Sequence, residues 1–143
     1  MHTFLILPHL RDLAIAYALS FFIGWDRERM ERSAGLRTFP LVAIAACGFI
    51  QAIEDILRGS PEGTARVVEG LITGIGFIGG GAIVKSGTTV RGTATAASLW
   101  ATGAIGAAVG LGAYDVACVV SLFTIATLRL LVPLKRQQPP SIE

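Results

Sequence analysis

The sequence predicts an all-α integral membrane protein with about five transmembrane helices that pack through glycine-rich faces. The 143-residue chain is 52% hydrophobic and only 15% charged, with a mean hydropathy of +0.64. This composition leaves too few polar side chains to cover a soluble domain of this size. The chain also contains 17 glycines, many of them inside apolar runs. In lipid, such glycines allow neighbouring helices to approach closely.

The first two apolar runs predict spans on either side of a charged link. Residues 10–25 form a span that is short for a bilayer and begins with Arg11 and Asp12, so we expect these side chains to reach the headgroups or the bilayer to thin there. Residues 1–9 form an N-terminal segment. After a link rich in arginine and acidic residues, a second span is predicted over residues 38–57, with Pro40 tolerated in its first turn.

The third span, residues 66–84, holds six glycines between Glu69 and Lys85. A glycine inside a helix costs about 0.8–1.0 kcal/mol relative to alanine in water, but in lipid the helix closes its own hydrogen bonds and glycine faces favour packing. Helical periodicity places Glu69 and Thr73 beside the glycines and most isoleucines on the other side. The predicted packing glycines of this span are Gly70, Gly74, Gly76 and Gly80.

The fourth span, residues 93–112, has small residues on one arc and Trp100 on the opposite side. Its arc comprises Thr95, Ser98, Thr102, Gly103, Gly106 and Gly110. We expect this arc to face the third span, making the third and fourth helices the closest pair in the fold. A fifth span over residues 113–132 completes a transmembrane domain of residues 10–132, and residues 133–143 form a short tail.

Two interpretations remain open for the intramembrane polar residues Glu69, Thr73, Thr95, Ser98 and Thr102. They can line a polar path, or they can serve helix packing. Glu69 is expected to point inward and to bond a polar group, because a carboxylate facing lipid is unfavourable.

Basic residues are distributed unevenly between the two ends of the predicted bundle. Nine lysines and arginines fall on one side, and only Arg11, Arg58 and Arg66 fall on the other. The positive-inside rule therefore predicts an outer amino terminus and a cytoplasmic tail. Acidic residues show the reverse bias, which suggests either an outer rim that attracts Mg²⁺ or solvated acids without a role. The rim acids are Asp12, Glu54, Asp55, Glu62, Glu69 and Asp115.

Several classes of function have little support in the sequence. There is no HExxH, GxSxG or phosphate-loop motif, so an enzyme is not expected. A net charge of +2 without a basic aromatic patch does not favour nucleic acid as a partner. Cys47 and Cys118 lie in apolar runs, which indicates neither a disulfide nor a metal site. No cofactor is predicted, and a metal ligand set cannot be assigned.

Three sequence blocks carry a resemblance to a known family. They are AGLRT at residues 34–38, GIGFIGGG at residues 74–81, and VRGTATAASLW followed by GAIG at residues 90–106. In order and spacing they resemble the membrane domain of the MgtC/SapB family, from about Leu13 to Val132. The resemblance implies a small bacterial inner-membrane protein with a regulatory role linked to magnesium limitation and stress. Better-known members add a soluble C-terminal domain, which this chain is expected to lack.

The resemblance also carries over particular residues. They are Asp26, Arg27, Gly35, Leu36, Arg37 and Thr38 near the charged link, the glycines of the third span, and Gly92, Thr95, Ala97 and Trp100 in the fourth. Asp26 stands where the family usually has Glu ahead of the arginine.

The predicted functional polar cluster lies at the cytoplasmic end of the bundle. It consists of Asp26, Arg27, Glu28, Arg37, Thr38 and Arg91. Asp26 or Glu28 is expected to pair with Arg37 or Arg91, forming either a docking surface or a set of ion pairs that anchors helix ends.

Two functions follow as candidates. The first is a regulator that acts through other membrane proteins, and the alternative is an oligomeric cation transporter or channel. The expected partners are the lipid bilayer, a second copy of the chain in a homo-oligomer, most simply a dimer, and other membrane proteins.

Overall fold

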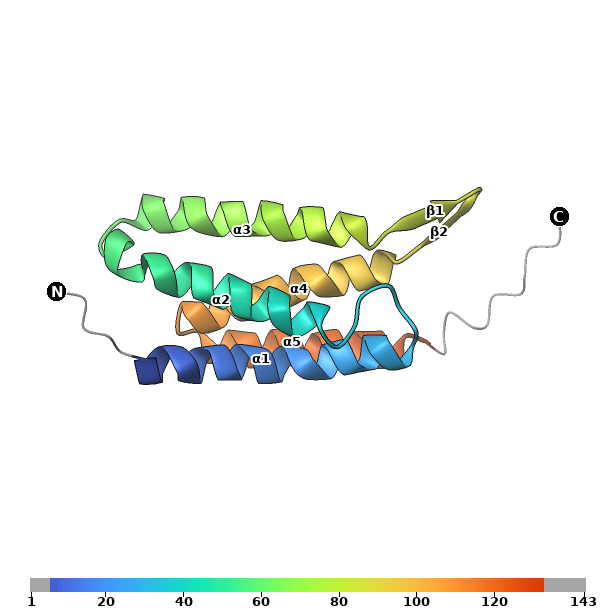
Figure 1. The fold of residues 1–143 in the computed structure, drawn as a ribbon, viewed down its shortest axis with the longest axis horizontal. Coiled ribbons are helices and arrows are strands. Elements are labelled where there is room, and N and C mark those ends of the chain that lie inside the picture. The colour runs from blue at the N-terminus through green and yellow to red at the C-terminus, as the bar shows by residue number, and fades with distance from the viewer. Residues whose placement is uncertain (1–5, 133–143) are drawn as a thin grey trace.

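The computed structural model describes residues 6–132, except for the side chains of Asp55 and Leu57. It consists of five long helices and a short β-hairpin (Figure 1). The helices are α1 (Ile6–Arg29), α2 (Thr38–Leu57), α3 (Pro61–Gly81), α4 (Thr93–Gly110) and α5 (Tyr114–Leu130). The predicted all-helical class is confirmed, whereas the predicted tail, residues 133–143, lies outside the described residues.

Two helix boundaries differ from the sequence prediction. α1 has 24 residues rather than the expected short span, so at 1.5 Å per residue it is about 36 Å long. α3 begins at Pro61, ahead of the predicted third span of residues 66–84, because Pro61 suits the first helical position. The Ser60 hydroxyl accepts a hydrogen bond from the Gly63 amide at 3.2 Å and caps this helix.

The connection between α3 and α4 is a two-stranded hairpin, formed by β1 (Val84–Ser86) and β2 (Thr89–Arg91). Gly87 adopts a positive φ of 59° in its two-residue turn. Gly92, which follows β2, has a φ of 89°, and a Cβ atom there would fall on the carbonyl oxygen of Ala82. Only glycine therefore allows the chain to turn back so closely into α4.

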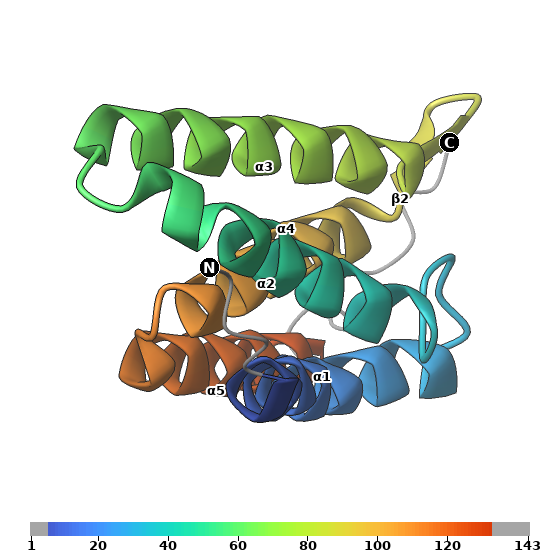
Figure 2. The same ribbon diagram turned by 60° about the vertical axis from the view of Figure 1, so that its left-hand side comes forward.

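The helices form three tiers, with α3 at one edge, α2 and α4 in the middle, and α1 and α5 at the other edge (Figure 2). The central helix is α4, which contacts each of the other four helices. Its buried residues include Thr95, Ser98, Thr102, Gly103 and Gly106, whereas Trp100 is 53% exposed. The predicted small-residue arc of this helix is therefore confirmed as its buried face.

The expected closest pair of helices is corrected by the structure. The glycines at the C-terminal half of α4 face α2 instead of α3. A Cβ atom at Gly106 would fall on the Ala43 carbonyl, and one at Gly110 would lie 2.8 Å from Cβ of Ile50. The close α2–α4 approach arises because α2 brings small residues and an apolar face to these positions.

The α3–α4 contact also differs from the expected arrangement of two glycine faces. The side chain of Ile75 on α3 fills the space left by Gly103 on α4, and Gly79 lies close to the Ala96 carbonyl. The predicted packing glycines of α3 have open space instead. No atom lies within 4 Å of a Cβ built at Gly70, Gly74, Gly76 or Gly80. The inward face of α3 is thus centred on Ile75 and Gly79, and the side chain of Ile75 packs into the gap at Gly103.

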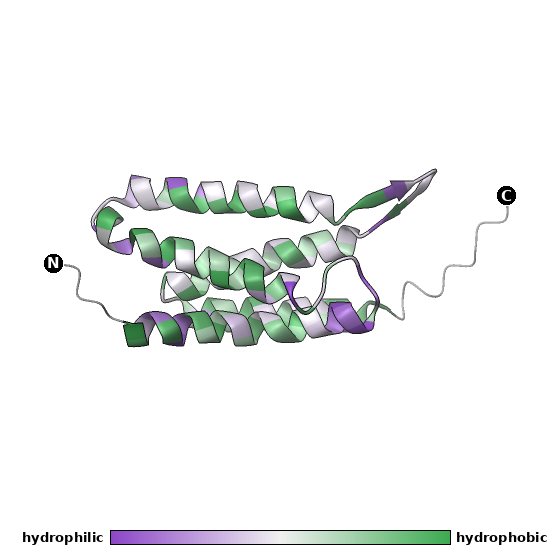
Figure 3. Ribbon diagram, viewed as in Figure 1, coloured by the Kyte–Doolittle hydropathy of each residue, from purple (hydrophilic) through white to green (hydrophobic). Residues whose placement is uncertain are grey.

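Polar and apolar residues occupy different parts of the bundle. Polar residues concentrate in the loop after α1, in the hairpin and at the turn between α2 and α3, while apolar residues cover much of the helix sides (Figure 3). Large apolar side chains on these sides are exposed, including Phe22, Phe49, Phe77 and Leu122. Among the described helices, α1 alone is both long and apolar enough to span a bilayer by composition, and α2 contains a shorter apolar stretch, Thr38–Glu54.

Candidate functional site

A buried ion-pair cluster, here called the inner cluster, lies where α1 ends and consists of Asp26, Arg27 and Arg129. Arg27 donates to Asp26 Oδ2 from Nη2 at 2.6 Å and from Nε at 3.2 Å. Arg129, near the end of α5, donates from Nε to Asp26 Oδ1 at 3.2 Å. One carboxylate thus joins two helices that are separated by about a hundred residues in the chain.

The burial of the inner cluster makes its pairing obligatory. Only 4% of the Arg27 side chain and 12% of the Asp26 side chain are exposed, whereas 58% of Arg129 is exposed. An unpaired charge in such a place would be strongly destabilising. The last turn of α1 also favours cations, because helix carbonyls there carry partial negative charge. Asp26 is therefore the centre of the cluster, and Arg129 is its accessible member.

The expected pairing of Asp26 or Glu28 with Arg37 or Arg91 is corrected by this geometry. Arg37 and Arg91 are exposed, and the structure gives neither an ion pair with those acids. Asp26 instead binds the arginine next to it and the arginine on α5. Sequence reasoning missed Arg129, because nothing in its local sequence distinguishes it from a basic residue at a helix end.

Glu28 has a different role, which is to hold the loop that contains AGLRT. Its carboxylate accepts a hydrogen bond from the Leu36 amide at 3.1 Å, and a Cβ atom at Gly35 would collide with it. On the inner side of the loop, a Cβ atom at Gly24 of α1 would lie 3.2 Å from the Gly35 carbonyl oxygen. The loop is therefore clamped against α1 at two glycines.

The same loop also reaches the end of α3. The Ser33 hydroxyl donates to the Ala82 carbonyl at 3.3 Å. Arg37 precedes α2 without forming a side-chain cap, and Thr38 is the first residue of that helix. The predicted residues Asp26, Arg27, Glu28, Arg37 and Thr38 are thus gathered at one end of the bundle, whereas Arg91 lies on the exposed hairpin.

A second polar cluster, here called the outer cluster, lies at the opposite end and joins three helices. Asp12 accepts hydrogen bonds from Arg11 Nε at 2.8 Å, Tyr114 Oη at 2.8 Å and Gln51 Nε2 at 3.1 Å. The Arg11 guanidinium also lies over the Tyr114 ring, 5.6 Å from its centroid. The sequence signal for it was weak, because Gln51 and Tyr114 are single polar residues near helix ends.

Two of the buried hydroxyl groups of α4, those of Ser98 and Thr102, bond to their own helix. Ser98 donates to the Thr95 carbonyl at 2.9 Å, and Thr102 donates to the Ser98 carbonyl at 2.8 Å. A hydroxyl that crosses between helices is found on α5, where Ser121 donates to the Leu19 carbonyl at 2.8 Å. These two hydroxyl donors therefore find their acceptors on α4 itself and need no neighbouring helix for a hydrogen bond.

Glu69 does not point inward as expected. It is exposed on α3, and its backbone carbonyl accepts a hydrogen bond from Thr73 Oγ1 at 3.0 Å. Within a single chain it bonds neither Thr95 nor Thr102, because Ile75 and Gly79 define the inward face of α3. Among the described residues, no three histidine, cysteine, aspartate or glutamate side chains gather as a metal site.

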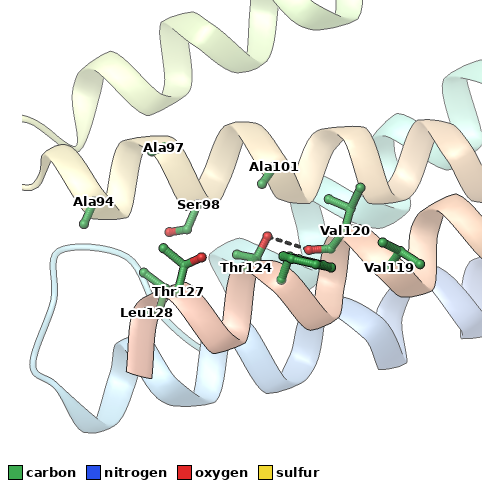
Figure 4. Close-up of a pocket in the computed structure, with 10 residues that line it drawn as sticks. Ala94, Ala97, Ser98, Ala101, Val119, Val120, Thr124, Thr127 and Leu128 are labelled. Carbon is green, nitrogen blue, oxygen red and sulfur yellow. Dashed lines mark hydrogen bonds between the residues drawn. The ribbon is translucent and has the colours of Figure 1, made fainter. Parts of the chain in front are cut away.

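A shallow groove of about 410 Å³ runs between α4 and α5 (Figure 4). Its walls are almost entirely apolar, with Ala97 and Ala101 from α4 and Val119, Phe123 and Leu128 from α5. The Thr124 hydroxyl at its edge donates to the Val120 carbonyl of its own helix. The groove thus offers shape and apolar contact but few polar groups.

Comparison with known proteins identifies the family. Residues 13–137 match the sequence profile of the MgtC family. The chain belongs to the MgtC family. Protein MgtC of Brucella abortus (strain 2308) is 43% identical over 122 residues, which cover 85% of this chain and 50% of the relative. Protein MgtC of Salmonella typhimurium (strain LT2) is 37% identical over 127 residues, covering 89% and 54%.

The MgtC match supports the resemblance that the three sequence blocks predicted. The chain spans about half the length of the MgtC relatives that it matches. No solved structure matches it significantly. The chain is thus an MgtC-type membrane protein, and both polar clusters except Arg11 and Asp12 lie inside the matched residues.

Proposed function

We propose that this MgtC-type protein crosses the bacterial inner membrane five times and regulates other membrane proteins during magnesium limitation or related stress. Its amino terminus lies outside and its carboxyl terminus in the cytoplasm, as the distribution of basic residues favours. The exposed aromatic and aliphatic side chains along the helices support contact with lipid. The link to magnesium rests on the family resemblance.

The observation that carries the regulatory proposal is the inner cluster. Asp26 connects the ends of α1 and α5, and the loop beside it is tied to α1 by Glu28 and to α3 by Ser33. A shift of any of these helices would change the position of the exposed Arg37 and Arg129. Charges on such a surface can bind an acidic face of a partner and report the state of the bundle.

The arrangement of polar groups favours regulation over cation transport. A transporter needs polar groups that are available to the ion along a path. The buried hydroxyls Ser98 and Thr102 are bonded to their own backbone, and Glu69 lies on the outside of the chain. The inner and outer clusters lie at opposite ends of the bundle, so they do not by themselves make a continuous path for an ion.

Growth and flux measurements test this proposal together. A deletion strain is expected to grow normally with ample Mg²⁺ and poorly when Mg²⁺ is limiting. Arg37→Gln should fail to restore growth, because it removes a charge from the proposed docking surface. The variant should still reach the membrane, since Arg37 is exposed and its loss leaves the fold intact. Glu62→Gln, an exposed change on α3, is the matched control and should restore growth.

Purified protein in liposomes separates regulation from transport. The proposal predicts no Mg²⁺ flux above that of empty vesicles. Saturable Mg²⁺ flux would overturn it and establish the transport alternative, and normal growth of the Arg37→Gln strain would remove the proposed docking surface.

A further inference from the structure

The outward face of α3 meets no other part of the chain that the structure describes, although it carries charges and a large aromatic ring. Gly70, Gly74 and Gly80 have no atom within 4 Å of an added Cβ, and Phe77 between them is 86% exposed. Glu69 is exposed on the same helix. In a membrane, this face would present both a carboxylate and bare backbone to lipid, which is unfavourable unless another protein surface covers it.

We infer that the outward face of α3 is the contact surface for a second copy of this chain. The inference goes beyond the proposed regulatory function and rests on its placement of the chain in a bilayer. It commits to a two-fold pair in which the two α3 helices lie side by side and run in the same direction. Such a pair must use the same patch on both copies, so the patch has to complement itself.

The shape of the patch is complementary to itself. Phe77 is a projecting ring, and Gly74 and Gly80 lie one helical turn before and after it as open gaps. In a parallel two-fold pair, a side chain at the interface packs between residues of the partner helix that lie about one turn apart. The ring of each copy can therefore fill the glycine gap of the other.

The charges of the patch are also complementary to themselves. Arg66 and Glu69 are both exposed, and neither side chain forms an ion pair with another described residue. Their separation of three residues is the same one-turn offset that relates Phe77 to its glycines. The same alignment of the two helices thus places Arg66 of each copy near Glu69 of the other. The two-fold symmetry forms this pair twice, and Phe77 of each copy fills the glycine gap of the other.

Cysteine cross-linking of the full chain in membranes tests the surface directly. The experiment uses a Cys118→Ala background, which leaves Cys47 buried in the core. Thr73→Cys, on the outward face of α3, is expected to form an intermolecular disulfide in high yield. Leu122→Cys, which is 65% exposed on α5, is the matched control and should remain unlinked.

Substitutions that leave the single chain intact then measure the contribution of each feature. Gly80→Leu meets no atom within its own chain but fills the gap, so it should weaken the dimer by about tenfold or more in dissociation constant. Ala104→Leu, exposed on α4, is the control and should leave the dimer unchanged. Glu69→Arg should weaken the dimer, and the exchange variant Arg66→Glu/Glu69→Arg should restore it.

Assembly is the only readout here, so these results are independent of growth or Mg²⁺ flux. A monomer at all protein-to-lipid ratios would overturn the inference. A dimer that cross-links through Leu122→Cys, or one that is unaffected by Gly80→Leu, would also overturn it by placing the contact on another face.

Discussion

Gly106 of α4 lies so close to Ala43 of α2 that a Cβ atom at position 106 would fall on the Ala43 carbonyl oxygen. This contact sets the separation of the two central helices, and Gly110 continues it one turn later against Ile50. The closest backbone approach between helices is thus between α2 and α4, whereas Gly70, Gly74, Gly76 and Gly80 of α3 have no described atom within 4 Å of an added Cβ.

Leucine at the two kinds of glycine should have opposite effects. Gly106→Leu forces α2 and α4 apart and should lower the free energy of unfolding in detergent by about 3 kcal/mol. Gly76→Leu, which meets no atom within 4 Å, should be neutral or slightly stabilising, because leucine favours the helix more than glycine does. Thermal unfolding of the detergent-solubilised monomer measures both. Equal loss of stability would contradict the assignment of the two faces.

Removal of the Asp26 carboxylate should be far more damaging than removal of its exposed partner. Asp26→Asn leaves Arg27 as an uncompensated buried charge, which should lower stability by about 3–5 kcal/mol. Arg129→Gln should cost about 1 kcal/mol or less, because more than half of that side chain is exposed. Chemical unfolding in detergent checks the order.

The double variant Asp26→Asn/Arg27→Gln provides the control for this prediction. It removes the stranded charge and should recover part of the loss. If the double variant were less stable than Asp26→Asn alone, Arg27 would not depend on Asp26 for its compensation.

The outer cluster should show energetic coupling between α1 and α5. A double-mutant cycle of Asp12→Asn and Tyr114→Phe is expected to give non-additive losses of stability, since the phenol donates to an ionised carboxylate. The same cycle with Tyr17→Phe, an exposed tyrosine on α1, should give none. Additive effects of Asp12→Asn and Tyr114→Phe would mean that the cluster does not hold the two helices together.

Reporter fusions test the proposed topology. A fusion after Gln137 should be active in the cytoplasm, and a fusion within residues 59–63 should be active in the periplasm, because basic residues concentrate at the former end. Reversed activities at both sites would mean that the orientation of the bundle is opposite to the proposed one. Activity in the same compartment at both sites would exclude an odd number of spans between them.

Much of the candidate site could be read from residue types, but its connections could not. The small-residue arc of α4 was predictable because helical periodicity alone places Ser98, Thr102 and Gly106 on one side. The pairing of Asp26 was not, because an arginine at position 129 reaches it only after α5 packs against α1. The outer cluster was missed for the same reason, since its members come from three helices.

The sequence by itself determined the helical class, the family, and the polar ends of the bundle, because hydropathy, glycine content and short motifs are local properties of the chain. The orientation of each glycine face was decided only by the tertiary structure. Glycine runs look alike in sequence whether they face a neighbour or open space, and the choice depends on which side chain fills which gap. Ile75 fills the gap at Gly103, and Gly70, Gly74, Gly76 and Gly80 are then left on the outward side of α3.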